Sequence, residues 1–177
     1  MQRPKKIVVI GPESTGKSTL CEQLAAHYQT KWVPEYARQF LLDIKRPYNY
    51  EDLLTIAKIQ LEQEDRIFAS VRTPFLFIDT DMYVMKVWCE YVFGKCHPFI
   101  LDEIVKRCYD GYLLCNTDLP WVDDILREYP DPETRSILYR MYQDLMINQS
   151  TPWIEIKGGY DERLQKAVDF TDMITIR

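Results

Sequence analysis

The sequence predicts an α/β fold in which a parallel β-sheet is covered by helices on both faces. Two observations support this prediction. Short apolar segments typical of buried strands alternate with longer segments that have helical spacing. No repeat, low-complexity segment or linker interrupts the 177 residues, a length that suits one domain with a sizeable core. We therefore expect residues 1–177 to form a single domain.

Five segments are predicted as strands: 6–10, 31–33, 75–78, 112–115 and 153–156. Helices are predicted at about 19–28, 35–44, 51–72, 82–93, 98–108, 133–148 and 161–169. In parallel sheets of this kind, ligands bind beyond the carboxyl ends of the strands. The segments that follow each strand are therefore the places to look for a site.

The first strand leads into a complete phosphate-binding loop, Gly11-Pro12-Glu13-Ser14-Thr15-Gly16-Lys17-Ser18. Its glycines let consecutive N–H groups face inward at the positive end of the following helix, where they hold phosphate oxygens. Lys17 can reach the terminal phosphates, and the Ser18 hydroxyl can bind Mg²⁺. The sequence thus predicts a P-loop NTPase fold. The expected nucleotide-binding residues are Gly11, Glu13, Ser14, Thr15, Gly16, Lys17, Ser18 and Thr19, together with Arg135 from the segment after the fourth strand.

Two acidic residues follow the third strand, in Asp79-Thr80-Asp81. Asp79 is predicted to be a second oxygen ligand of Mg²⁺, directly or through water, beside Ser18. Asp81 could reach the acceptor hydroxyl as a general base. Alternatively, one of the two is the N-cap of the helix that begins near Met82, a position that Asp suits well.

The second strand ends at Pro34-Glu35-Tyr36-Ala37-Arg38, where an acceptor substrate is expected to bind. Glu35 could accept hydrogen bonds from sugar hydroxyls, Tyr36 could stack on a ring, and Arg38 could hold a phosphate or an acid. For Glu35 alone, a place in the first turn of a helix is an equally good interpretation.

A polar, proline-bounded segment after the fourth strand, at about 117–135, is predicted to be a mobile lid. An arginine delivered by a lid can neutralise charge on a transferred phosphoryl group, and Arg127 and Arg135 are the candidates. Asp123 and Asp124 either orient an arginine or keep the lid soluble. Arg140 is predicted to be a solvated helix residue.

Two further segments are assigned structural roles. The segment 157–163 is predicted to be a turn followed by a helix, with contact to an adenine base as the alternative. Gln60 and Glu64 share one face of the helix at 51–72, and we expect that face to be solvated, with a substrate-lining Gln60 as the alternative.

The composition narrows the partners and the location. A net charge of −5 and a pI near 5.1 argue against nucleic acid or a membrane surface as partner, and no apolar run is long enough to span a bilayer. A cytoplasmic location is predicted, and the oligomeric state, a homo-oligomer included, is left open. The cysteines are expected to be buried small hydrophobes rather than disulfides: Cys21, Cys89, Cys96, Cys108 and Cys115.

Several of these motifs, taken together, resemble a known family. The phosphate loop, Pro-Glu-Tyr-Ala-Arg at 34–38, Phe-Ile-Asp-Thr-Asp at 77–81 and Trp-Val-Asp-Asp-x-x-Arg at 121–127 are similar to the ribosylnicotinamide kinase domain of the bacterial NAD-biosynthesis regulators. Gly94-Lys95-x-His97-Pro98 also looks like that family. The resemblance runs in order over nearly the whole chain.

The resemblance implies a five-stranded P-loop kinase with a lid. It also implies ATP-dependent phosphorylation of the ribose 5′-hydroxyl of nicotinamide riboside, with Asp79 and Asp81 near Mg²⁺ and the hydroxyl, and Glu35, Tyr36 and Arg38 around the riboside. Because the phosphate loop begins at residue 11, we do not expect repressor or adenylyltransferase activity. The alternatives are a kinase for another nucleoside or nucleoside monophosphate, and an ATP-binding regulatory switch without metabolite kinase activity.

Overall fold

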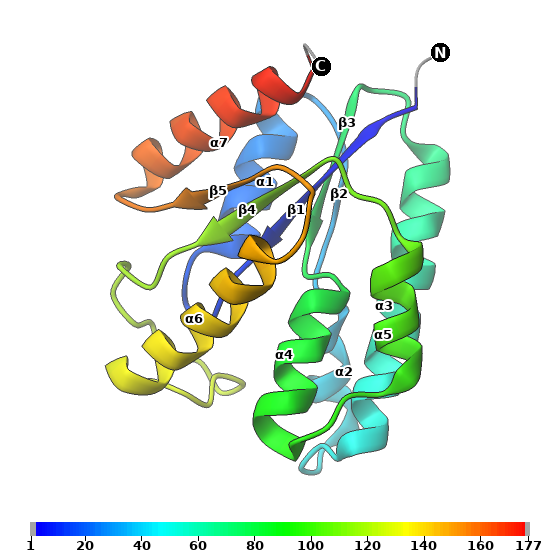
Figure 1. Ribbon diagram of the computed structural model, residues 1–177, viewed down its shortest axis with the longest axis vertical. Helices are drawn as coiled ribbons and strands as arrows, with labels where there is room; N and C mark the ends of the chain where they lie inside the picture. Colours follow the sequence, from blue (N-terminus) through cyan, green and yellow to red (C-terminus); the bar gives the residue numbers. More distant parts are fainter. Residues whose placement is uncertain (1–2, 176–177) are drawn as a thin grey trace.

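The computed structural model describes residues 3–175, which form a parallel five-stranded sheet between layers of helices (Figure 1). The strands are β1 (Lys5–Ile10), β2 (Trp32–Val33), β3 (Phe75–Asp79), β4 (Gly111–Cys115) and β5 (Trp153–Ile156), in the spatial order β2-β3-β1-β4-β5. The helices are α1 (Lys17–His27), α2 (Tyr36–Ile44), α3 (Tyr50–Ser70), α4 (Met82–Phe93), α5 (Pro98–Lys106), α6 (Pro132–Ile147) and α7 (Tyr160–Thr175). The predicted fold class and every predicted strand and helix are confirmed, with shifted boundaries.

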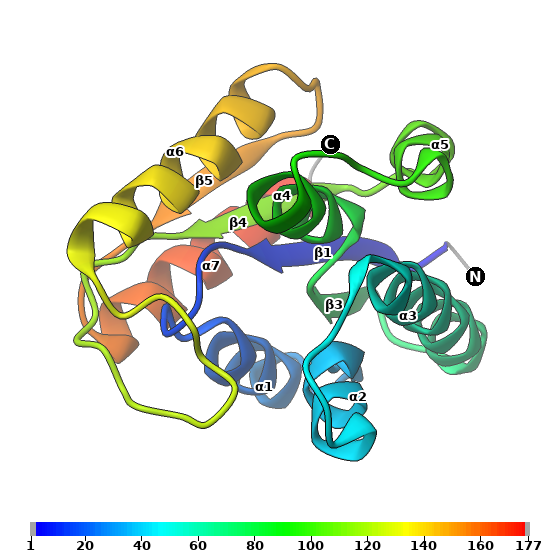
Figure 2. The same cartoon turned by 90° about the horizontal axis from the view of Figure 1, so that it is seen from below.

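The core forms because the strands are apolar on both faces. Ile7 and Val9 pack with α1 and α7 on one face, whereas Val8 and Ile10 pack with α4, α6 and the end of α3 on the other. Figure 2 shows α1 and α7 below the sheet and α4 and α6 above it. A third apolar cluster joins α2, α3, α4 and α5. It supports the part of the molecule that faces the phosphate loop.

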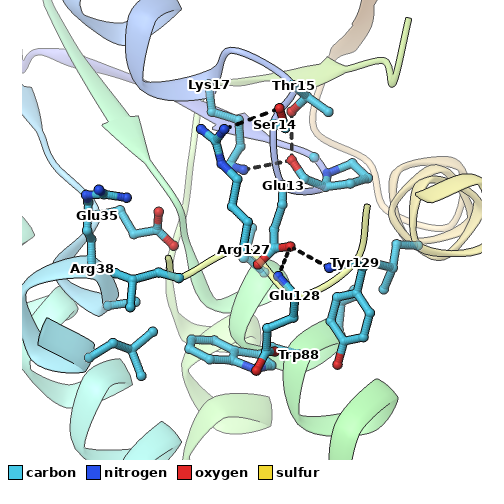
Figure 3. A pocket seen from close by; sticks show the side chains of 18 of the residues that line it. Glu13, Ser14, Thr15, Lys17, Glu35, Arg38, Trp88, Arg127, Glu128 and Tyr129 are labelled. Atoms are coloured by element: carbon cyan, nitrogen blue, oxygen red, sulfur yellow. Dashed lines mark hydrogen bonds between the residues drawn. The ribbon is translucent and has the colours of Figure 1, made fainter. Parts of the chain in front are cut away.

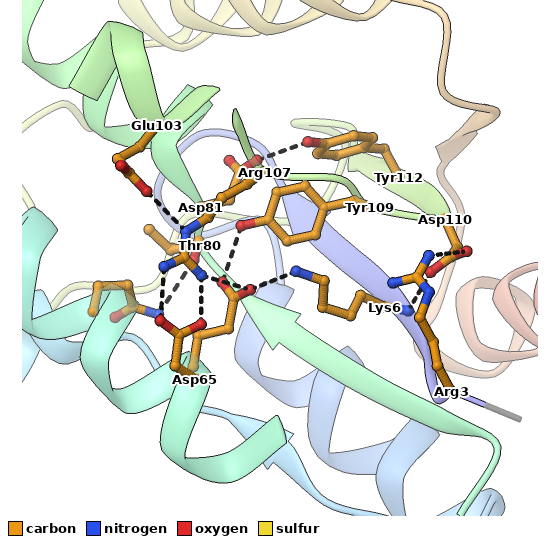
Figure 4. Close-up of polar contacts among 12 residues, drawn as sticks. Arg3, Lys6, Asp65, Thr80, Asp81, Glu103, Arg107, Tyr109, Asp110 and Tyr112 are labelled. Atoms are coloured by element: carbon orange, nitrogen blue, oxygen red, sulfur yellow. Dashed lines mark hydrogen bonds and ion pairs between the residues drawn. The ribbon is translucent and has the colours of Figure 1, made fainter. Parts of the chain in front are cut away.

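Two polar residues of α3 are buried beside its apolar ones, which corrects the prediction that their face is solvated. Gln60 and Glu64 are each 1% exposed. Glu64 accepts hydrogen bonds from the Lys6 ammonium at 2.9 Å and from the Tyr109 hydroxyl at 2.9 Å, and Arg107 lies 3.4 Å away (Figure 4). The helical periodicity of α3 predicts that Gln60 and Glu64 share a face. It does not predict that this face is buried, because the groups that Glu64 contacts come from β1 and from the segment before β4.

The exposure of the cysteines agrees with the prediction only in part, whereas that of Arg140 agrees fully. All five cysteines are free; Cys21, Cys89 and Cys115 are buried as expected, whereas Cys96 is partly exposed and Cys108 is exposed. Arg140 is exposed, as predicted. Within residues 3–175, no helix is long and apolar enough to cross a bilayer.

Candidate active site

The phosphate loop joins β1 to α1 and has the backbone that phosphate binding requires. Gly11 has a φ of 140° and Gly16 a φ of 78°, conformations that favour glycine. A Cβ on Gly11 would lie 2.7 Å from the Cys115 carbonyl oxygen, so a larger residue would force the loop away from β4. As far as the described residues go, no side chain caps the first N–H groups of α1. These groups are therefore available to an anion.

Contacts inside the loop fix its shape. The Thr15 hydroxyl and the Lys17 ammonium both donate to the Pro12 carbonyl, at 2.8 and 2.9 Å. Arg163, which is 2% exposed, donates to the carbonyl oxygens of Thr15 at 3.0 Å and Gly158 at 2.7 Å. The predicted turn and helix at 157–163 are thus present, and they brace the phosphate loop through Arg163.

A cavity of about 360 Å³ lies between the phosphate loop and α2, α4 and the lid (Figure 3). The loop residues 11–19 form one wall. Glu35 and Arg38 line the opposite side, and Arg127 lines the cavity from the lid. The structure therefore brings the phosphate loop and two of the four predicted acceptor residues, Glu35 and Arg38, to one space.

Asp79 lies beside the loop at the end of β3. The Ser18 hydroxyl donates to one oxygen of the Asp79 carboxylate at 2.5 Å. The other oxygen is buried and has no hydrogen-bond partner among residues 3–175. Burial, followed by the negative charge of Glu35, raises the pKa of Asp79 well above its usual range. A buried oxygen in this setting suits a cation ligand.

The paired oxygen ligands fit Mg²⁺ only together with ligands from outside the protein. The part of the chain that the structure describes contains no group of three or more His, Cys, Asp or Glu side chains placed to hold a metal. Mg²⁺ usually keeps several waters and binds through one or two carboxylates plus substrate phosphates. Ser18 and Asp79 match that protein contribution.

Asp81 is the N-cap of α4. One oxygen accepts hydrogen bonds from the Tyr83 and Val84 amides at 2.9 and 3.4 Å, and the other accepts one from the Tyr112 hydroxyl at 2.9 Å. The side chain is 1% exposed, and burial raises the pKa of Asp81 to about 7. The cap interpretation therefore holds for Asp81. The geometry does not support a general base at this position, because both oxygens are held inside the protein.

The acceptor loop divides its side chains between two sides of the molecule. Glu35 precedes α2 and lines the cavity. Arg38 lines it too, but its guanidinium is paired with the lid residue Asp124 at 2.8 Å. The Tyr36 ring packs near Phe40 and lines a separate groove against α3. Ring stacking by Tyr36 in the cavity is thus not supported, because the start of α2 points this side chain the other way.

Aromatic residues missed from the sequence line the acceptor side of the cavity: Tyr48, Trp88, Tyr91, Tyr129 and Tyr142. The Trp88 indole N–H donates to the Tyr48 hydroxyl at 3.1 Å, which donates to the Glu128 carboxylate at 2.8 Å. These residues come from a loop, two helices and the lid. Only the number of tyrosines, twelve, hinted at them.

The lid lies over the phosphate loop. Residues 116–131 between β4 and α6 form neither helix nor strand. The Glu13 carboxylate accepts hydrogen bonds from the amides of Glu128 at 3.0 Å and Tyr129 at 3.3 Å (Figure 3). The Ser14 hydroxyl accepts one from the Val122 amide at 2.9 Å. The predicted segment is therefore placed where a lid can act on bound phosphates.

The two candidate arginines differ in position. Arg127 donates to the Val122 carbonyl and lies 3.4 Å from the Ser14 hydroxyl, on the cavity wall. Arg135 is 8% exposed and donates to the carbonyl oxygens of Ser14 and Leu119, both at 3.3 Å. Arg135 thus ties the start of α6 to the phosphate loop, and direct contact with the nucleotide is not supported for it.

Comparisons with known proteins agree with this architecture. The chain is 27% identical over 172 residues to the trifunctional NAD biosynthesis/regulator protein NadR of Salmonella typhimurium and 25% identical to that of Escherichia coli K12. Each match covers 93% of this chain and 41% of the relative, so the chain spans less than half the length of these curated relatives. The resemblance to the NAD-biosynthesis regulators is confirmed.

Solved structures show the fold. A crystal structure of NadR protein in complex with NR superposes with a TM-score of 0.81 at 22% identity, covering 99% of this chain and 50% of that one. Thymidylate kinase from Ehrlichia chaffeensis gives a TM-score of 0.64 at 14% identity, covering 96% and 99%. A family model described as AAA domain matches residues 6–163, and on this match the chain belongs to the AAA domain family.

Proposed function

We propose that this chain is an ATP-dependent kinase that phosphorylates the ribose 5′-hydroxyl of nicotinamide riboside to give nicotinamide mononucleotide. The observation that supports it most is the shared cavity, which has a phosphate loop on one side and an aromatic wall with Glu35 on the other. Phosphoryl transfer depends mainly on positioning the two reactants and on neutralising charge. A cavity of this composition offers both.

The acceptor side suits a cationic, unphosphorylated nucleoside. A monophosphate acceptor would need free cationic side chains. The two arginines on this side are instead paired with carboxylates, Arg38 with Asp124 and Arg46 with Asp52. Aromatic faces such as that of Trp88 attract cations, and nicotinamide riboside carries a positive charge on its pyridinium ring. The similarity to NadR, one structure of which holds NR, points to the same acceptor.

We assign the catalytic roles on the basis of the contacts described above. Lys17 and the loop amides would hold the phosphates of ATP, and Ser18 and Asp79 would hold Mg²⁺, whose charge offsets that of the phosphates. Arg127 would neutralise charge on the transferred group from the lid, and Glu35 would accept a hydrogen bond from the acceptor hydroxyls. We also propose that 1–177 forms one kinase domain with a lid at about 117–135. A cytoplasmic location stays a prediction from the sequence, and the oligomeric state stays open.

ADP release tests the proposal, with nicotinamide riboside, common nucleosides and their monophosphates offered as acceptors. We expect nicotinamide riboside to stimulate turnover most strongly and nicotinamide mononucleotide to appear by mass spectrometry. Lys17→Ala should abolish the stimulation while the protein stays folded. Stimulation by a monophosphate instead would identify a nucleotide kinase. Turnover no faster than hydrolysis by water with any acceptor would contradict the kinase assignment and favour the ATP-binding switch.

A further inference from the structure

Gln60 connects the two halves of the proposed active site without lining its cavity. The side chain projects from α3 and is 1% exposed. Its carbonyl oxygen accepts a hydrogen bond from the Tyr36 amide at 2.8 Å. Its amide nitrogen lies within hydrogen-bonding distance of three carbonyl oxygens, those of Pro34 at 3.3 Å, Asp79 at 3.3 Å and Thr80 at 3.2 Å. One buried amide thus contacts four backbone groups.

These backbone groups belong to the two segments that carry the functional carboxylates. Pro34 and Tyr36 flank Glu35, and Asp79 is the residue beside Ser18. The β2–β3 ladder is short, since it pairs only Trp32 with Phe77 and Val33 with Ile78. Gln60 therefore supplies the connection between the two strand ends where the sheet no longer does.

Both segments need such a connection. The Tyr36 amide belongs to the first turn of α2, whose N–H groups lack helical partners, and within residues 3–175 the N-cap Glu35 makes no side-chain capping bond. Thr80 has a φ of 77°, a left-handed conformation that is unfavourable for a β-branched residue. Such a conformation persists only where the surroundings hold it. Gln60 holds the Thr80 carbonyl, and the Val9 carbonyl accepts from the Thr80 amide at 3.3 Å.

The backbone conformation of Thr80 determines the directions in which the neighbouring Asp79 and Asp81 carboxylates point. Asp79 faces Ser18 and the phosphate loop, whereas Asp81 caps α4 and contacts Tyr112. A change in this turn would move the Asp79 carboxylate relative to Ser18. A change at 34–36 would move Glu35 relative to the acceptor.

We propose that Gln60 is a positioning residue that sets the distance between the acceptor-binding Glu35 and the magnesium-binding Asp79. This inference rests on the proposed kinase function. Because reacting groups must lie within a few tenths of an ångström of their productive geometry, a displacement of about 1 Å far from the chemistry can cost about 100-fold in rate. The effect of Gln60 is expected to act through backbone position, since its side chain lies behind the cavity wall.

Two substitutions test the role, with a matched control on the same helix. Gln60→Leu removes all four contacts, whereas Gln60→Glu keeps an acceptor for the Tyr36 amide and regains one donor when protonated. Gln63→Ala is the control, because among residues 3–175 the Gln63 side chain donates to the Pro34 carbonyl alone, at 2.7 Å. Thermal unfolding of each variant checks that it is folded.

For Gln60→Leu we expect kcat to fall by about 10- to 100-fold and the Mg²⁺ concentration for half-maximal activity to rise. The KM for ATP should rise together with this Mg²⁺ requirement, while the affinity for metal-free ATP should stay within twofold. Gln60→Glu should be impaired less, and its deficit should shrink as the pH falls, because only the protonated carboxyl can donate to the carbonyls. Gln63→Ala should resemble the wild type within twofold.

A binding measurement separates this inference from the proposed function. Calorimetry with a non-hydrolysable ATP analogue, carried out with and without Mg²⁺, gives the gain in analogue affinity that Mg²⁺ causes. The Gln60 variants should lose much of that gain and keep the metal-free affinity. If the wild type phosphorylates no acceptor, the kinase proposal fails, but the calorimetric result still tests Gln60. A folded Gln60→Leu variant with unchanged kcat and an unchanged Mg²⁺ gain would overturn the inference. Equal losses in metal-free and metal-dependent binding would overturn it as well.

Discussion

Arg127 and Arg135 are eight positions apart, and their surroundings assign them different tasks. Both guanidinium groups lie near the Trp121 ring, at 6.0 Å and 5.6 Å from its centre. Arg135 is buried against backbone carbonyls, and burial lowers its pKa. Arg127 lies on the cavity wall beside Ser14. Of the two, only Arg127 can turn toward a transferred phosphoryl group without leaving a buried position.

Arg127→Ala should therefore lower kcat by about 100- to 1,000-fold while changing ATP affinity by less than about threefold, because the guanidinium is expected to act mainly on transition-state charge. Steady-state kinetics and analogue binding measure the two effects. Arg140→Ala, an exposed arginine of α6, is the control and should have no effect. Equal losses in kcat and in ATP affinity would instead place Arg127 in ground-state binding.

At the residue scale, a motif indicated which side chains are functional but not where each one points. Ser18, Asp79 and Arg127 lie near the phosphate loop, as the convergence of strand ends at one edge of a parallel sheet predicts, and their roles stay predictions. The roles of Asp79 and Asp81 could not be separated, because the left-handed Thr80 between them decides their directions. The burial of Gln60 could not be foreseen either, since its partners are backbone groups at or just beyond the ends of β2 and β3, 19 or more residues away in the sequence.

The lid is the element that connects the donor and acceptor sides. On the donor side, Glu13 holds two consecutive lid amides. On the acceptor side, Asp124 pairs with Arg38 and Glu128 accepts from Tyr48. The acceptor-side contacts are exposed, and such contacts contribute little, about 0–1 kcal/mol each. The Glu13 side chain is partly buried and accepts from both amides, so we expect it to contribute most to closure.

Glu13→Ala should open the lid, because it leaves the Glu128 and Tyr129 amides without their acceptor. A hydrogen bond to a charged group contributes about 1.5–3 kcal/mol, and partial exposure reduces this. We expect the amides at 128 and 129 to exchange hydrogen about 5- to 30-fold faster, as measured by mass spectrometry or NMR. Glu133→Ala, an exposed acid in the first turn of α6, is the matched control. Unchanged exchange at 128 and 129 would show that other contacts hold the lid.

At the element scale the sequence was most informative. Continuous apolar runs identify strands that are buried on both faces, and Ile7-Val8-Val9-Ile10 is fully buried as that pattern requires. The contacts of the lid could not be predicted, because it forms no regular element and its partners, Glu13 and Ser14, are more than 100 residues away. The aromatic wall of the cavity was missed for a similar reason, since its members come from separate elements.

Across the whole molecule, a buried charged network joins the sheet to the helices behind the site. Glu64 on α3 contacts Lys6 on β1 and Arg107 and Tyr109 in the segment before β4. Glu64 lies one helical turn from Gln60, so the same face of α3 contacts both the active-site backbone and this network. The network thus fixes α3 against the sheet, and α3 fixes the strand ends.

Removing Glu64 alone should destabilise the protein strongly, because Lys6, whose side chain is only 12% exposed, is left without its partner. Breaking one side of a buried ion pair costs about 3–5 kcal/mol, a large share of the about 5–15 kcal/mol that stabilises a typical domain. We therefore expect Glu64→Leu to lower the free energy of unfolding in urea by about 3 kcal/mol or more. Lys6→Met combined with Glu64→Leu should recover most of this loss, since apolar replacement of a whole buried pair is often neutral.

Asp65→Ala is the control for this experiment. Asp65 also pairs with Arg107, at 2.7 Å, but its side chain is 63% exposed, and exposed pairs contribute about 0–1 kcal/mol. If Glu64→Leu costs no more than Asp65→Ala, the buried network does not hold α3 in place. If instead the double variant regains stability but keeps a reduced kcat, then the charges themselves, and not only the packing of α3, tune the active site. Recovery of both stability and kcat is the result that the positioning role of α3 predicts.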